Sequence, residues 1–372
     1  MHVCFCISAI GGGGGAERAL ATLLSLLHRD GVRVSLLTLE AADAPTAFAL
    51  PDIRIERLDI LGGRGLRRLR NLASRRREIG RGIDRVAPDV VVSFMDTMNV
   101  AVLIATRGSG RPVVISERTD PAHHALPGWK RLMRRLTYPQ CDRLVVQTHR
   151  VAAFFAWMEP QQIAVIANPV PQDGSLAAPD LPDREGRHRI VAVGRLSHEK
   201  RFGLLIRAFG RLAEAHPDWD LVIYGDGPER EALAAAVADL GIAHRVSLPG
   251  WRTDIGEALA ESHVMAFPSR YEGFPNALAE AAAAGLPSVG FSGVSGVEDI
   301  ILDGKTGFLV DPSNPEKGLT AALDTLMAEP ARRKTMGMEA RTHARCWKPE
   351  RIMGEWLALF HELHGSSVTR RQ

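Results

Sequence analysis

The residue pattern with the most chemical content lies around two glutamates, Glu272 and Glu280, which are separated by seven residues. An apolar strand-like run, residues 263–267, precedes them, and an Ala-rich helical run follows. Gly273 lets a ligand approach the backbone closely, and Pro275 suits the first position of a helix. The start of that helix would offer N–H groups and a positive dipole end to a phosphate, and the two carboxylates could hold hydroxyls beside it. The pattern predicts a nucleotide-sugar site.

Two cations follow a second strand-like run. Arg195 and Lys200 lie in residues 194–200, between that run and the next helical pattern. Cations there fit a diphosphate and would stabilise the charge that leaves when its bond to a sugar breaks. Taken alone they could equally be an exposed surface pair. The diphosphate is favoured because the Glu272 loop would lie at the carboxyl edge of the same sheet.

A glycine run, residues 11–15, stands between the first strand-like run and a helix. Such a loop suits close approach to a phosphate and is equally compatible with plain flexibility. A dinucleotide site would add an acidic residue at the end of the next strand, a position that Glu40 could fill. An oxidoreductase therefore stays open as an alternative.

The clearest electrostatic feature is the run from Arg64 to Arg85, which holds nine arginines against Glu78 and Asp84. Its apolar residues recur at helical spacing, so one face should be apolar and the other cationic. Residues 129–136 form a second basic-apolar patch in the same half. Such helices contact anionic lipid or a phosphate-bearing acceptor, or they pack their leucines inward behind a solvated face. Aromatic residues hardly interleave with the arginines, which disfavours nucleic acid.

Metal and thiol chemistry find little support in the sequence. The four cysteines form no CxxC pair, and Cys4 and Cys6 suit one buried face of the first strand. His123 and His124 are adjacent, so they point apart and make poor joint ligands. We expect no metal and no cofactor, a nucleotide sugar being a co-substrate.

Short apolar runs alternate with helical patterns along the chain, which predicts βαβ units and parallel sheets. Strands are expected at 3–8, 34–39, 90–94, 113–116 and 144–147, and again at 190–193, 221–224, 245–248, 264–267 and 288–291. Helices are expected at 202–215, 228–240, 275–285 and 350–363. The economical architecture is α/β, with two doubly wound, Rossmann-like domains facing each other across a cleft.

The length of 372 residues also favours two domains, and 45% apolar with 24% charged residues is typical of a soluble globular protein. The expected division is a first domain at 1–170, a Pro- and Asp-rich linker at 171–187, a second domain at 188–348, and a helix at 349–364 that packs back on the first. Residues 1–185 carry 24 Lys and Arg against 19 Asp and Glu, so this half should face an anionic partner. No leader and no run of membrane-span length is evident, so we expect a cytoplasmic location.

Taken together, the motifs resemble the retaining glycosyltransferases of family 4, which have the GT-B fold. The residues that carry the resemblance are Gly14, Gly15, Glu17, Arg18, Gly194, Arg195, Lys200, residues 225–228, Glu272 and Glu280. Residues 93–100 and 115–118, with the arginine-rich helix, narrow it to bacterial enzymes that add N-acetylgalactosamine or related hexoses to undecaprenyl-diphosphate-linked oligosaccharides.

The resemblance implies roles for single residues. Arg195, Lys200 and Glu272 would form the catalytic group, with both cations on the donor diphosphate and Glu272 on the sugar hydroxyls. The other donor-binding residues would be Gly14, Gly15, Gly250, Trp251, Arg252, Gly273, Phe274, Asn276, Ala277, Leu278 and Glu280. The acceptor or the membrane would meet Arg67, Arg68, Arg75 and Arg118. Arg118 stands where many members have His, and it is a poor general base because it stays protonated.

The implied activity is metal-independent, retaining transfer of a hexose (GalNAc, Gal, GlcNAc or Glc) from a UDP-sugar. The acceptor would be an undecaprenyl-diphosphate-linked glycan at the inner face of the cytoplasmic membrane, in polysaccharide or glycoprotein glycan assembly. Two alternatives remain open, a sugar-nucleotide epimerase of GT-B-like fold and a non-catalytic nucleotide-binding protein.

Overall fold

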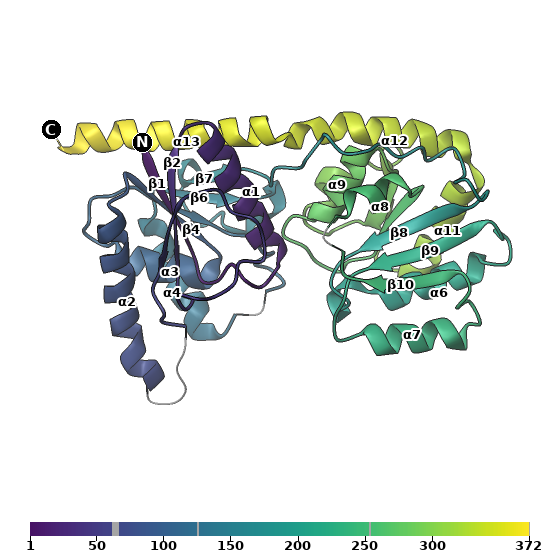
Figure 1. Cartoon of the computed structure of the whole chain (residues 1–372), viewed down its shortest axis with the longest axis horizontal. Coiled ribbons are helices and arrows are strands. Elements are labelled where there is room, and N and C mark those ends of the chain that lie inside the picture. The colour runs from purple at the N-terminus through teal and green to yellow at the C-terminus, as the bar shows by residue number, and fades with distance from the viewer. Residues whose placement is uncertain (62–66, 125, 253, 372) are drawn as a thin grey trace. The chain divides into compact units, whose positions relative to one another are not determined.

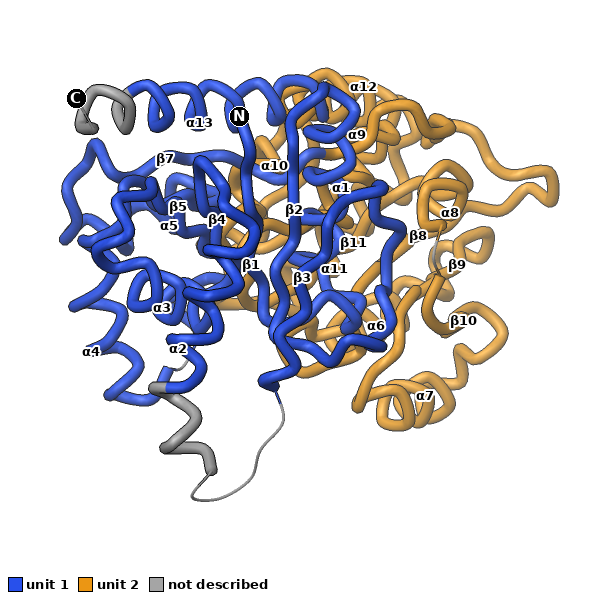
Figure 2. Tube along the Cα trace, turned by 60° about the vertical axis from the view of Figure 1, so that its left-hand side comes forward, with its two compact units in different colours: residues 1–169, 349–372 blue, residues 170–348 orange. Residues whose placement is uncertain are grey.

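The computed structural model describes residues 1–61, 67–124, 126–252 and 254–371, without the side chains of residues 67–73 and 366–371. The chain divides into two compact units, residues 1–169 with 349–372 and residues 170–348 (Figures 1 and 2). Each unit contains one sheet in which every strand pairing is parallel. The expected α/β class with two parallel sheets is confirmed.

The sheet of the first unit has the strand order β3-β2-β1-β4-β5-β6-β7. Its strands are β1 (His2–Ile7), β2 (Arg33–Thr38), β3 (Arg54–Arg57), β4 (Val90–Phe94), β5 (Val113–Ser116), β6 (Arg143–Val146) and β7 (Ile163–Val165). Its helices are α1 (Gly15–Arg29), α2 (Arg67–Val86), α3 (Asp96–Ala105), α4 (Gly128–Thr137), α5 (His149–Phe154) and α13 (Pro349–Arg371). Helices cover both faces, so the central strands β1 and β4 are buried throughout.

Successive side chains of β1 point to opposite faces of the sheet and so belong to two separate hydrophobic cores. Phe5 and its neighbours on one face pack with α1 and α13. Cys4 and Cys6 share the opposite face with residues of α2 and α3, and both are buried free thiols. This is the placement that period-two alternation predicts for a strand covered on both sides.

The last helix, α13, completes the first of these cores although it is remote in sequence. Trp356 and Phe360 are buried, and the Trp356 ring stacks on Phe94 with centroids 6.3 Å apart. Truncating such an aromatic side chain costs about 3–5 kcal/mol, so the stability of the first unit depends on this segment.

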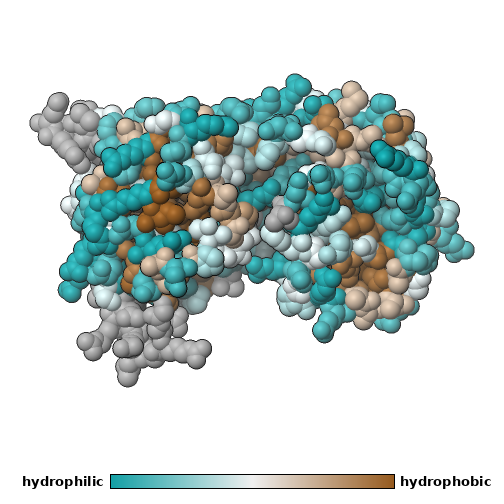
Figure 3. All heavy atoms as spheres, viewed as in Figure 1, coloured by the Kyte–Doolittle hydropathy of each residue, from teal (hydrophilic) through white to brown (hydrophobic). Residues whose placement is uncertain are grey.

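The sheet of the second unit has the order β10-β9-β8-β11-β12-β13. Its strands are β8 (His188–Val193), β9 (Trp219–Tyr224), β10 (Val246–Gly250), β11 (Val264–Phe267), β12 (Ser288–Phe291) and β13 (Gly307–Val310). Its α-helices are α6 (Phe202–Leu212), α7 (Arg230–Asp239), α8 (Gly256–Ala260), α9 (Asn276–Ala284), α10 (Val297–Ile300), α11 (Pro315–Ala328) and α12 (Pro330–Ala344). Helix α6 packs against α7 and α11, and α9 packs against α8 and α12 (Figure 1). In the space-filling view, hydrophobic residues (brown) lie beside hydrophilic ones (teal) on the visible face of each unit (Figure 3).

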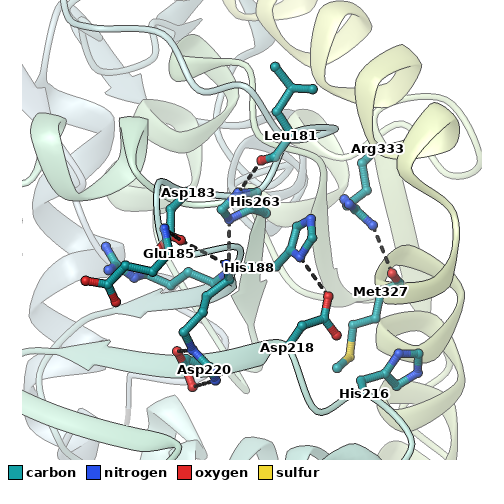
Figure 4. A network of polar contacts seen from close by, with 12 residues as sticks. Leu181, Asp183, Glu185, His188, His216, Asp218, Asp220, His263, Met327 and Arg333 are labelled. Carbon is teal, nitrogen blue, oxygen red and sulfur yellow. Dashed lines mark hydrogen bonds and ion pairs between the residues drawn. The ribbon is translucent and has the colours of Figure 1, made fainter.

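The stretch expected as a linker, residues 171–187, lies along the second unit. The N–H of Ala177 donates to the carbonyl of Ala284 at 2.9 Å, and Arg333 donates to the carbonyl of Pro179 at 2.5 Å. His263 forms a hydrogen bond of 2.7 Å with the carbonyl of Leu181, drawn as a dashed line in Figure 4. The stretch therefore contacts the second unit at several points along its length.

His263 holds this stretch as a neutral ring. Its Nδ1 accepts from the N–H of Arg189 at 2.9 Å, so Nε2 carries the proton donated to Leu181. Burial lowers the pKa of His263 to about 4. His188, whose pKa burial also lowers, stacks on Trp219 and faces Asp218 (Figure 4).

Candidate functional site

The direction of strand progression in the second unit reverses between β8 and β11. After β8 the chain adds β9 and β10 on one side, and it then returns to place β11 on the other. Loops at the carboxyl ends of such a strand pair diverge, and ligands bind in the crevice they leave. Lys200 follows β8 and Glu272 follows β11, so the two residues come from the two sides of this switch point.

Lys200 and Glu272 form an ion pair there. The Lys200 ammonium lies 2.5 Å from Oε1 of Glu272, and the two side chains are 17% and 13% exposed. The ammonium also lies 5.4 Å from the ring centroid of Phe267, the last residue of β11. An ammonium has three donors, and this arrangement aims one of them at Glu272. The pair can thus offer a cation to a diphosphate and a carboxylate to a hydroxyl at one point.

Arg195 lies on the same loop as Lys200, and its side chain is exposed. The loop is held by the turn after β9, because the N–H of Leu196 donates to the carbonyl of Asp226 at 2.9 Å. A Cβ at Gly225, where φ is +142°, would lie 1.9 Å from the carbonyl oxygen of Gly194. The turn at 225–228 therefore positions the loop that carries both cations.

The loop from Ser269 leads into α9, which begins at Asn276 with Pro275 as its N-cap. Helix formation thus starts one residue later than the sequence predicts. The N–H of Leu278 already donates to the carbonyl of Pro275 at 3.0 Å, and the Leu278 side chain is fully buried. Of the residues predicted to bind phosphate through their backbone, Leu278 therefore uses its N–H within the helix and its side chain in the core. Glu280 is half-buried in the second turn.

A support that sequence reasoning missed lies behind this loop. A Cβ at Gly296, where φ is +75°, would lie 2.5 Å from Cδ of Pro275 and 3.2 Å from the carbonyl oxygen of Gly273. The Ser295 hydroxyl is 3.5 Å from the same carbonyl. Phe274 is buried, and its ring centroid lies 6.0 Å from that of Trp347. The available sequence signal was the second Ser-Gly pair after β12, at residues 295–296.

Of residues 250–252, predicted to hold the base, Gly250 ends the edge strand β10 and the other two follow it. The carbonyl of Gly250 accepts from the N–H of Gly225 at 2.8 Å. Trp251 is 62% exposed, and Arg252 pairs with Glu257 at 2.7 Å. An exposed indole offers a flat face on which an aromatic base can stack.

The glycine run of the first unit is fixed by two glutamates. Helix α1 begins at Gly15, and the N–H of Gly14 donates to Glu17 at 3.2 Å. Glu40 accepts from the N–H groups of Ile10 and Gly11 at 3.0 and 3.3 Å. Its carboxylate thus holds the loop, which removes the residue that a dinucleotide site would use for ribose.

Of the three acceptor residues predicted on α2, Arg75 has a described side chain. Arg75 donates through Nε and one terminal nitrogen to the carbonyl of Ile60, at 3.2 and 2.9 Å. Its guanidinium is therefore bound to the chain's own backbone. The side chains of Arg67 and Arg68 lie outside the described part of the structure.

Arg118, expected to meet the acceptor or the membrane, is buried within the first unit. It is 8% exposed, donates to Oδ1 of Asn168 at 2.8 Å, and lies 4.2 Å from the centroid of the Phe94 ring. Burial lowers its pKa to about 9, which still leaves it charged at neutral pH. A charged group without an ion pair to any described carboxylate is costly to bury.

A buried polar cluster beside Arg118 also escaped the sequence analysis. Glu117 is 1% exposed, accepts from the hydroxyl of Tyr138, and lies 3.5 Å from Arg134. Burial raises the pKa of Glu117 against the opposing effect of Arg134. Asn99 donates to the Tyr138 oxygen at 3.2 Å. These residues lie on separate elements and meet only in the folded chain. No local sequence motif therefore indicated them.

The adjacent histidines His123 and His124, which the sequence disfavours as joint metal ligands, each lie near a carboxylate. His123 lies 2.7 Å from Asp120, and His124 lies 3.7 Å from Asp96. Among the described residues, no three His, Cys, Asp or Glu side chains gather as a metal site would require.

Two doubly wound parallel sheets, one with a cation–carboxylate pair at its switch point, define the class of the GT-B sugar transferases. Comparison with known families agrees. Residues 13–173 match the model of Glycosyltransferase Family 4, and residues 177–343 match that of the glycosyl transferases of group 1. The chain belongs to the family 4 glycosyltransferases, retaining hexosyltransferases of GT-B fold. The resemblance noted in the sequence is confirmed.

Individual relatives match along the whole chain. An α-1,4-N-acetylgalactosaminyltransferase of Campylobacter jejuni, named for a GalNAc-containing glycan on PP-undecaprenol, is 26% identical over 98% of this chain and 99% of its own. Sucrose-phosphate synthase from Thermosynechococcus elongatus has the same fold, with a TM-score of 0.83 at 17% identity over 98% of this chain and 99% of that one. Anabaena HepE in complex with UDP and glucose has a TM-score of 0.79 at 19% identity, over 97% of this chain and all of that one.

Proposed function

We propose that this transferase moves a hexose, without a metal ion, from a UDP-sugar to a glycan carried on undecaprenyl diphosphate. Membership of family 4 establishes sugar transfer from a nucleotide sugar. The observation that carries the choice of site is the Lys200–Glu272 pair at the switch point of the second sheet.

The donor half of the proposal follows from the charges at that point. Lys200 and Arg195 would neutralise the diphosphate as it departs, and the start of α9 would add its dipole. Glu272 and Glu280 would hold sugar and ribose hydroxyls. UDP as the nucleotide is supported by Anabaena HepE, which has UDP bound.

The acceptor half rests on the first unit. The arginines of α2 offer charge to a diphosphate, and the Campylobacter relative is named for a PP-undecaprenol-linked glycan. Helix α4 adds three exposed apolar residues, Trp129, Leu132 and Leu136, flanked by Arg131 and Arg135. No described helix is long and apolar enough to cross a membrane. We infer that a lipid-linked acceptor is met at the membrane surface through this mixed basic and apolar face.

One assay tests the proposal against its alternatives. Purified protein is incubated with a panel of UDP-sugars, with and without an undecaprenyl-diphosphate-linked glycan, and UDP release is followed. Acceptor-dependent release of UDP with retention at the transferred sugar is expected. An epimerised sugar without UDP release would support the epimerase instead, and binding of UDP without consumption of any donor would support a non-catalytic protein.

A further inference from the structure

We propose that a groove between α2, α3 and α4 binds the isoprenoid chain next to the acceptor's diphosphate. The inference rests on the proposed function, because it names how the same enzyme would recognise the lipid carrier of its acceptor. The groove lies wholly within the first unit.

The groove is long and roomy. Its volume is about 960 Å³, and its lining extends from Ser8 and Asp96, beside the carboxyl ends of β1 and β4, to Ile104 and Ala105 at the far end of α3. Helix α3 has ten residues, so the groove follows it for about 15 Å. One end therefore opens at the sheet edge where ligands of such sheets bind, and the other leads away from it.

The floor of the groove is apolar. Ile79 of α2, Val100, Ala101 and Ile104 of α3, and Met133 of α4 all line it. A groove of this size lined by aliphatic side chains fits a flexible hydrocarbon, whose burial is favourable in proportion to the apolar area removed from water.

The rim of the groove is cationic. Arg76 and Arg77 of α2 and Lys130 of α4 border it, and no ion pair joins either arginine to a described side chain. The lining contains two acidic residues, and each has a cationic neighbour. Asp84 pairs with Arg111 at 2.8 Å, and Asp96 lies 3.9 Å from Arg134. A hydrocarbon floor below a cationic rim is complementary to an anionic amphiphile, and this combination selects a prenyl diphosphate over an apolar peptide.

Arg134 supplies an independent sign of an anion at the sheet-edge end. It lines the groove but is only 5% exposed, and within the described structure its Nε and one terminal nitrogen have no hydrogen-bond partner. The carboxylates of Glu117 and Asp96 lie 3.5 and 3.9 Å from it, which balances its charge without satisfying these donors. Buried donors are normally satisfied, so a diphosphate oxygen is the group that this guanidinium lacks.

Binding of a short prenyl diphosphate tests the groove directly. Calorimetry is run on the full chain with saturating UDP, which occupies the donor site, using farnesyl diphosphate, inorganic diphosphate and farnesol in separate titrations. Farnesyl diphosphate is expected to bind at least about tenfold more tightly than either of the other two. Equal affinities for farnesyl and inorganic diphosphate would overturn the proposal, and equal affinity for lysophosphatidic acid would show a general anionic-lipid site instead.

Variants locate the site. Ile104→Glu puts a carboxylate in the apolar floor and should remove the tenfold gain, whereas Met338→Glu, at a 65% exposed position of the second unit, should retain it. Arg134→Gln should weaken binding of both diphosphates. If that variant does not fold, as its thermal midpoint will tell, Ile104→Glu still decides the matter. An unchanged farnesyl diphosphate affinity in Ile104→Glu would refute the assignment.

Turnover separates failure of the groove from failure of the proposed function. Two acceptors are compared that share glycan and diphosphate but carry undecaprenyl or a short alkyl chain. Ile104→Glu should raise the KM for the undecaprenyl acceptor about tenfold and leave that for the short acceptor within about twofold. Wild-type protein that uses both acceptors with equal KM refutes the groove alone. Wild-type protein that uses neither refutes both proposals.

Discussion

Lys200 and Glu272 are 72 residues apart, yet they meet because each follows a strand beside the switch point. They neutralise each other, so neither charge is left uncompensated in a partly buried place. A diphosphate would replace part of this pairing by adding its own charge to Lys200. In the proposed site, the pair would thus be preformed for its ligand.

Breaking this pair should remove transfer while the fold persists. For Lys200→Met and Glu272→Gln we expect kcat/KM to fall at least about 100-fold, because in the proposed site each group would act on charge or hydroxyls at the reacting centre. UDP release measured with acceptor present checks this. Lys305→Met serves as the matched control, because Lys305 pairs with Glu339 at 3.3 Å on the exposed surface of the same unit and should matter little. Near-normal turnover in either active-site variant would remove the pair from the mechanism.

Arg118 poses a different question, since it holds a buried charge with an amide and two aromatic rings as its neighbours. A buried charge of this kind costs stability, so Arg118→Met should leave the free energy of unfolding within about 1 kcal/mol of wild type or raise it. Transfer should fall if the charge serves the acceptor or the reaction. Urea unfolding and UDP release are measured together. Loss of stability with unchanged turnover would assign Arg118 a structural role only.

Among the elements, the central strands were predictable, whereas three of the four edge strands were not. The exception is the edge strand β10, which was expected at 245–248 and lies at Val246–Gly250. The bounds expected for β4, β5, β11 and β12 match the structure, because these strands are buried on both sides and read as continuous apolar runs. The edge strands β3, β7 and β13 were missed. β3 has the sequence Arg-Ile-Glu-Arg, with a single apolar residue, and β7 is an apolar run of only three residues, so one is too polar and the other too short to be recognised as a strand.

In the candidate site too, some features were predictable from sequence and others were not. The Glu272 loop, the Lys200 loop and the glycine run lie on local motifs, so their sequence indicated them. The hydrogen bonds of Glu40 to the glycine run, of Arg75 to Ile60 and of Arg333 to Pro179 join elements far apart in sequence. A single sequence contains no signal for such contacts, because they depend on tertiary packing.

The attachment of residues 171–187 to the second unit should depend on pH through His263. Its pKa is about 4 in the fold against 6.5 as the ordinary value, so the neutral form is favoured by folding. Stability is therefore complete above pH 6.5 and falls as the pH drops toward 4, by up to about 3 kcal/mol. Urea unfolding of wild type and His263→Asn at several pH values between 7.5 and 4 measures this, and the difference between them should shrink as the pH falls.

His198→Asn is the control for that series, because His198 has a side chain that is 83% exposed. Its unfolding free energies should run parallel to those of wild type at every pH. A constant difference between wild type and His263→Asn would contradict the role assigned to the neutral His263 ring.

At the scale of the whole molecule, positive charge is unevenly divided along the chain. Residues 1–185 carry the excess of positive charge, and within this range α4 exposes Trp129, Leu132 and Leu136 at 58–60% along one stripe. Exposed apolar residues spaced three and four apart beside Arg131 and Arg135 are typical of a helix that lies in a membrane interface. The carrier lipid of the proposed acceptor would be reached from that interface.

Flotation with vesicles that contain an anionic phospholipid tests this. The wild-type chain should float with anionic vesicles but not with neutral ones, and added salt should weaken the binding because it screens charges beyond about 8 Å at physiological ionic strength. Leu132→Glu combined with Leu136→Glu should lower the bound fraction at least about tenfold, since each leucine contributes about 1.5–3 kcal/mol when buried. Leu240→Glu, at a 45% exposed position of the second unit, should bind like wild type. Equal flotation of the double variant and wild type would mean that α4 does not meet the membrane, and the acceptor would then have to be reached by another face of the protein.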